Sequence, residues 1–75
     1  MSPRLPRVTA AQVIRVLEKC DFRLVRQSGS HRIYKNEAAQ RVTVPFHSGK
    51  ILHPKVLRSI LRDTELTVDE FKELL

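Results

Sequence analysis

Apolar residues recur at helical spacing near the start of the chain. Arg15, Glu18 and Lys19 interrupt an apolar stripe made of Val13, Val16, Leu17 and Cys20. This spacing predicts an amphipathic helix with one face on a core. Thr9 and Gln12 have the separation of a capping box, and Val8 and Val13 have that of the apolar pair that flanks one, so the helix should begin after Thr9.

A second stretch of helical spacing lies in the last third of the chain. Pro54 suits the first turn of a helix, and the apolar stripe that follows it is Val56, Leu57, Ile60 and Leu61. Its other side carries Lys55, Arg58 and Arg62. Thr67 and Glu70 form a second capping box, with Leu66 and Phe71 as the flanking apolar pair, and predict a short terminal helix.

Between the helices the hydrophobic period changes to that of strands. Three short runs rich in β-branched and aromatic residues are separated by turn-forming residues, and Pro45 ends the third run: Phe22–Gln27, His31–Lys35 and Arg41–Val44. They predict a three-stranded antiparallel meander. With the helices, the order is αβββαα, and we expect an α+β fold with a single layer of helices on one face of the sheet.

Length and charge limit the kinds of protein and partner that fit. A chain of 75 residues predicts one small domain, residues 8–75, preceded by a basic arm, residues 1–7. Residues 1–62 carry thirteen Lys and Arg against three Asp and Glu, whereas residues 63–75 carry one base and five acids. The basic body favours a polyanion or an acidic protein as partner, although solvated charge alone would give the same pattern.

The sequence gives little support for a disulfide-bonded, membrane, metal-binding or nucleotide-binding protein. The single Cys20 cannot form an internal disulfide, and the absence of a long apolar run leads us to expect a cytoplasmic protein with no membrane partner. We interpret Cys20 as a small buried residue. His47 and His53 lack the spacing of metal ligands, and Ser48-Gly49-Lys50 lacks the glycines of a phosphate-binding loop. We therefore expect no metal and no small-molecule cofactor.

The residues Gly29-Ser30-His31 stand at the predicted hairpin between the first two strands, close to Arg26, Arg32 and Lys35. A histidine there can transfer a proton to or from a ribose hydroxyl while the cations hold the phosphate. An ordinary surface histidine is the alternative. Strict alternation puts His31 on the same side as Ile33, and if that is the core side, a bulge or a position at the rim must expose it.

Two further groups are candidates for RNA contacts. Tyr34 falls beside Arg32 on the face opposite Ile33, where it can stack on a base or lie half-buried against the next strand. Lys55 and Arg58, on the basic side of the second helix, can contact phosphates or be simply solvated.

Taken together, four stretches resemble the HicA family of toxin ribonucleases, and the likeness spans nearly the whole chain from Thr9 onward. They are Gly29-Ser30-His31-Arg32-x-Tyr34, Val42-Thr43-Val44-Pro45-x-His47-x-Gly49-Lys50, Leu57-Arg58-x-Ile60-Leu61-Arg62 and Leu66-Thr67-x-x-Glu70-Phe71. The resemblance implies a double-stranded-RNA-binding-like fold, mRNA cleavage, and silencing by a HicB antitoxin. It places the catalytic histidine on His31, supported by Gly29 and Ser30. His47 matches a recurrent family position without a role. Pro54-Lys55 departs from the usual Gly-Thr and alters the entry to the second helix.

Two functional hypotheses remain. The first is a metal-independent endoribonuclease toxin, in which His31 is the acid–base residue, a ribose 2′-hydroxyl attacks to give a cyclic phosphate, and Arg26, Arg32 and Lys35 hold RNA. The second is an RNA-binding module of the same fold that does not cut. The complete Gly-Ser-His hairpin favours the enzyme. A DNA-binding protein is a weaker third idea, because the chain has no helix-turn-helix spacing.

Overall fold

Three helices and three strands follow one another in the predicted order. In the computed structural model, which describes residues 4–75, they are α1 (Ala10–Lys19), β1 (Arg23–Ser28), β2 (His31–Lys35), β3 (Arg41–Pro45), α2 (Pro54–Thr64) and α3 (Val68–Leu74). The expected α+β fold is confirmed, and it agrees with the double-stranded-RNA-binding-like description. Residues 1–3 of the predicted basic arm lie outside the described residues, and Leu5 of the same arm packs against the core.

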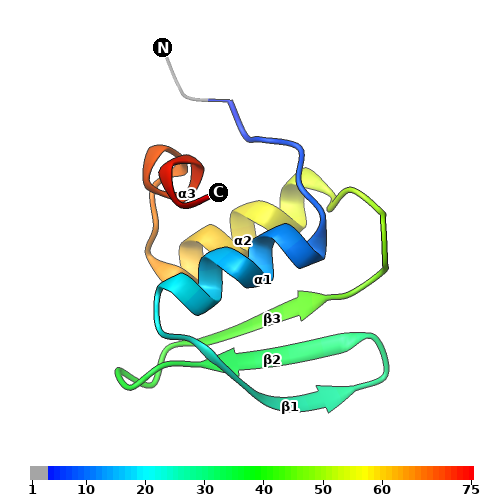
Figure 1. The fold of residues 1–75 in the computed structure, drawn as a ribbon, viewed down its shortest axis with the longest axis vertical. Coiled ribbons are helices and arrows are strands. Elements are labelled where there is room, and N and C mark those ends of the chain that lie inside the picture. The colour runs from blue at the N-terminus through cyan, green and yellow to red at the C-terminus, as the bar shows by residue number, and fades with distance from the viewer. Residues whose placement is uncertain (1–3) are drawn as a thin grey trace.

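The helices are not a single layer. Figure 1 shows α1 and α2 over one face of the sheet and α3 beyond them, on the side away from the strands. Contacts link α2 and α1 to β3, whereas α3 contacts α1. Phe71 anchors α3 because its ring is buried in the core. The expectation of one helical layer therefore holds for α1 and α2 and is wrong for α3.

Local signals set the helix boundaries. The Thr9 hydroxyl accepts from the Gln12 amide (3.3 Å), and the Gln12 side chain accepts from the Thr9 amide (2.9 Å), which is the predicted capping box. The flanking Val8 and Val13 are both buried. Val8 also accepts from the Leu52 amide (2.8 Å), so the start of α1 is tied to the loop after β3.

The other two helices are capped as well. Pro54 occupies the first turn of α2, as predicted, and the imidazole Nδ1 of His53 accepts from the Lys55 amide (3.0 Å). The capping box of Thr67 and Glu70 starts α3, and the hydrogen bonds from Thr67 lower the pKa of the Glu70 carboxyl. The pattern of the sequence therefore located all three helices, but it did not identify His53 as a cap.

The sheet has the order β1-β2-β3, and its register shows which face the helices cover. Tyr34 pairs with Val42, and Arg32 pairs with Val44. Directly paired residues of antiparallel strands lie on the same face. Val42 and Val44 are fully buried in the core (0% exposed), so these two pairs face the helices.

The other residues of the same strands make up the open face of the sheet, which no helix covers. They are Arg23, Arg26 and Ser28 on β1, His31, Ile33 and Lys35 on β2, and Arg41, Thr43 and Pro45 on β3. All six residues of the edge strand β1 are exposed. A bulge between Leu24 and Arg26 leaves Val25 without a partner on β2. Within residues 4–75, no helix is long and apolar enough to cross a membrane.

Candidate functional site

His31 is the first residue of β2 and lies on the open face of the sheet. It pairs with Ser28 on one side and with Pro45 on the other, and its side chain is exposed. The alternation that joins His31 to Ile33 is confirmed, but their shared face is not the core side, because the helices cover the face opposite. No bulge at the turn is needed to expose the imidazole.

The hairpin that presents His31 is a two-residue turn, Gly29 and Ser30. Gly29 has a positive φ (56°) and Ser30 does not, which is the φ pattern of a type II′ turn. The Ser30 carbonyl accepts from the Phe46 amide (2.7 Å), so the tip of the hairpin is bonded to the chain just after β3. Both residues thus fix the backbone at His31.

The imidazole of His31 has no hydrogen-bond partner among the described residues. Its neighbours on the open face are Ser28 and Pro45 across the strands and Ile33 two residues along β2. An imidazole in this position can exchange a proton with a ligand that lies on the sheet.

Cations share the open face with His31. Arg26 pairs with Ile33, and Lys35 ends β2, so two of the predicted phosphate contacts do lie on this face. Arg23 and Arg41 pair with Lys35 and were missed. The five-residue turn Asn36–Gln40 was the available signal, because closing it pairs Lys35 with Arg41.

Arg32 lies beside Tyr34 on the face opposite Ile33, as alternation predicted, and this separates it from the other cations that were expected to hold RNA with His31. Its guanidinium Cζ is 3.9 Å from the centroid of the Phe46 ring, a cation–π contact. Its Nε is buried without a hydrogen-bond partner. Arg32 therefore packs under the segment after β3, on the opposite side of β2 from His31, and does not join Lys35 on the open face.

Tyr34, a candidate for base stacking, also lies on this face. Its side chain is 3% exposed and belongs to the core cluster, opposite Val42. A buried ring cannot stack on a base without unpacking the core. Of the two alternatives, the structure supports burial against the neighbouring strand and not stacking on a base. Alternation could not choose between them, because it shows that Tyr34 and Ile33 face opposite ways but not which of the two faces the helices cover.

Lys55 and Arg58 form a separate surface. Both are exposed on α2, which packs on the face of the sheet opposite His31 (Figure 1). The structure does not bring them together with the open face. Any phosphate contact that they make is therefore separate from contacts at His31.

The remaining candidates do not assemble into a second site. His53 caps α2, and His47 is exposed in the loop before it. In the described part of the chain, no three His, Cys, Asp or Glu residues lie close enough to hold a metal ion. Burial raises the pKa of the Cys20 thiol, and the Asp21 and Glu70 carboxylates raise it further, which disfavours the reactive thiolate.

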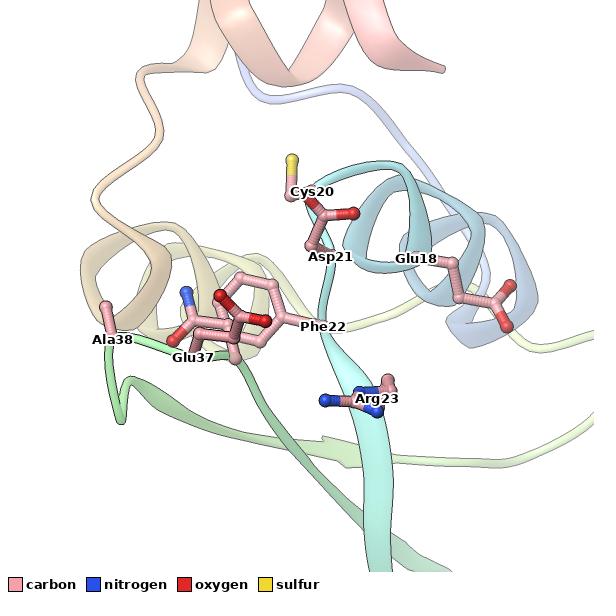
Figure 2. Close-up of a pocket in the computed structure, with 8 residues that line it drawn as sticks. Glu18, Cys20, Asp21, Phe22, Arg23, Glu37 and Ala38 are labelled. Atoms are coloured by element: carbon pink, nitrogen blue, oxygen red, sulfur yellow. The ribbon is translucent and has the colours of Figure 1, made fainter.

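A cavity of about 740 Å³ lies at the far end of the sheet from His31 (Figure 2). His31 begins β2, whereas residues 36–38 of the cavity wall follow its end. The wall combines the end of α1, the start of β1 and the β2–β3 turn, with Glu18, Asp21 and Glu37 as its acids. Three acids against one cation, Arg23, make this lining unsuitable for a polyanion, so the open face and not this cavity is the candidate site.

Comparison with known protein families gives one match. Residues 10–66 match the family described as "HicA toxin of bacterial toxin-antitoxin". No curated protein matches the chain. The matched segment contains the Gly29-Ser30-His31 hairpin, all three strands and α2.

Proposed function

The chain belongs to the HicA toxin family of bacterial toxin–antitoxin systems, and from this premise we propose that it is an endoribonuclease toxin that cleaves mRNA with His31 as its acid–base residue. The observation that carries the proposal is the placement of His31. Its ring is exposed and free of protein partners, on the one sheet face that no helix covers, and its backbone is fixed by the Ser30–Phe46 hydrogen bond. Arg26 and Lys35 share that face and supply positive charge.

The proposed reaction needs one proton carrier and a positive surface. The ribose 2′-oxygen forms a bond to phosphorus and gives up its proton, the bond from phosphorus to the 5′-oxygen breaks, and that oxygen takes up a proton. His31 carries one of these protons, and water carries the other. A 2′,3′-cyclic phosphate remains on the upstream fragment. Open-face cations offset the charge that develops on the phosphoryl oxygens.

A HicB-like antitoxin is the proposed inhibitory partner. The exposed cations on the open face have no carboxylate partner in the described chain, whose one ion pair is Arg62–Asp63. A partner that covers His31 would bury some of these cations and so needs acidic groups opposite them. Binding to the folded state alone also raises the stability of a domain this small.

The test compares His31→Ala with His47→Ala, substitutions of two exposed histidines, one at the start of β2 and one in the loop before α2. Purified variants are mixed with an mRNA transcript, with and without EDTA, and cleavage rates are read from gels. We expect His31→Ala to lose about 10² to 10⁴ of the rate, the usual contribution of an acid–base group. His47→Ala and the EDTA arm should cleave like the parent.

Circular dichroism shows whether each variant is folded. A folded His31→Ala protein that cleaves as fast as the parent would contradict the assignment of His31. Activity that vanishes with EDTA and returns with one added metal would contradict a metal-independent reaction. A parent protein that binds RNA and never cleaves it would favour the second hypothesis, an RNA-binding module of the same fold.

A further inference from the structure

Three cations lie directly opposite one another across the sheet, a feature that we call the cation row. Arg23 on β1 pairs with Lys35 on β2, and Lys35 pairs with Arg41 on β3. All three are exposed. Like charges that face each other across strands destabilise a sheet. The cation row therefore destabilises this end of the sheet.

No carboxylate among residues 4–75 forms an ion pair with the row. The one ion pair among residues 4–75 is Arg62–Asp63, on α2. Glu18, Asp21 and Glu37 line the cavity together with Arg23 of the row, but none of them forms an ion pair with a cation of the row. A folded protein that keeps three cations in register without an ion pair to any of them has the electrostatics of an anion site.

The row is distant from His31. His31 and Lys35 are the two ends of β2, four residues apart, and a strand rises about 3.4 Å per residue, which puts them about 14 Å apart. One phosphate cannot touch both. Arg26, opposite Ile33, lies between them on the same face. A chain of phosphates laid along the strands would meet His31, Arg26 and the row in turn.

No Phe, Tyr or Trp ring is available for base stacking on this face among residues 4–75. The chain has one Tyr, three Phe and no Trp. Tyr34, Phe22 and Phe71 are buried, and the Phe46 ring is covered by Arg32. Contacts on the open face therefore go to phosphates, which carry no sequence information.

We propose that the cation row of Arg23, Lys35 and Arg41 binds a backbone phosphate of the RNA, at a distance from the phosphate that is cleaved. The proposal rests on the proposed function, because it names where that substrate extends from His31. RNA fits better than an acidic protein, since protein interfaces have an apolar centre and the apolar residue beside the row on the open face, Ile33, is only 9% exposed. Of the exposed apolar residues that follow Arg23, Leu24 pairs with Tyr34 on the covered face and Val25 lies in the bulge without a partner. The acids beyond the row repel phosphates and so end the track there.

The first test measures binding alone, in the His31→Ala protein, so that no cleavage occurs. Arg23→Gln/Arg41→Gln is compared with a control of equal net charge, Arg15→Gln/Lys72→Gln, which changes exposed cations on α1 and α3. The probe is a fluorescent single-stranded oligouridylate, followed by anisotropy at several salt concentrations. The row variant should bind about tenfold more weakly, and its salt slope should fall by about 1.4, at about 0.7 per lost contact.

The control should keep the affinity and the salt slope of the His31→Ala parent. Equal affinities of the row variant and the control would overturn the proposal. So would a row variant that keeps its RNA affinity and instead loses affinity for poly-glutamate, because that result assigns the row to an acidic protein. Neither result depends on cleavage, so a failure of the proposed ribonuclease activity remains distinguishable.

The second test separates binding from a structural role. Lys35→Gln removes the central charge, so at low salt its Tm should rise by about 2–4 °C as the repulsion is relieved. Its RNA affinity should fall in the same preparation. A Tm that falls or stays the same would contradict the unrelieved repulsion on which the proposal depends.

Discussion

The two faces of the sheet differ in burial and in charge. On the covered face, Val42 and Val44 are fully buried, and Tyr34 completes the layer against α1 and α2. On the open face, the same strands present His31 and the cation row to solvent. Because strand residues alternate, one five-residue strand, β2, contributes to both faces.

This division separates stability from function within a few residues. Groups on the covered face fill the core, and the helix ends that frame it are capped. Groups on the open face include like charges in register and an imidazole without a protein partner. Arrangements that stabilise nothing in the free protein are expected where a ligand binds.

The largest difference in the free energy of unfolding should appear between substitutions at two neighbouring residues of β3, Val42 and Thr43. Val42→Ala removes two buried methyl groups from the covered face and should cost about 2 kcal/mol or more, since each buried carbon contributes about 0.8 kcal/mol and a cavity remains. Thr43→Ala changes the open face and should cost about 0.5 kcal/mol or less. Urea denaturation of both variants measures the difference, and equal losses would show that the open face also supports the fold.

A smaller loss of stability is expected at the hairpin that joins β1 and β2. Gly29→Ala should cost about 1–2 kcal/mol because a side chain is disfavoured at its positive φ, although a Cβ there meets no atom within 4 Å. Gly29→Asn should cost less, since Asn tolerates positive φ better. Thermal melts rank the two variants. If Ala matches the parent, the backbone angle is not what requires glycine at this position.

Local patterns predicted most of the fold. The capping boxes at Thr9 and Thr67 and the proline at position 54 act within a few residues, so the helix starts could be found from sequence. Turn residues bounded the strands to within one residue of Arg23–Ser28 and Arg41–Pro45. The placement of α3 beyond α1 could not be found this way, because it depends on where the buried Phe71 meets the rest of the core.

The site was only partly predictable for a related reason. Sequence alternation separated His31 from Tyr34, but the covered face is determined by pairing with β3, where Val42 and Val44 meet the helices. Tyr34 and Arg32 were candidates for RNA contacts because the sequence alone does not give the pairing of β2 with β3. Arg23 and Arg41 were missed because a cross-strand row has no signature in a single strand.

The most direct test of the division between the faces is an NMR titration with an oligouridylate, followed through methyl and imidazole signals. It uses the His31→Ala protein and the parent, and the parent spectra are taken before cleavage proceeds. The signals of the His31 ring in the parent and of the Ile33 methyl groups in both should shift, because these groups lie on the open face. The methyl groups of Val42 and Leu57 should not shift, since they are buried on the other side. Shifts that leave Ile33 unchanged and centre on α2 near Arg58 would contradict the account and place the RNA on the helical surface.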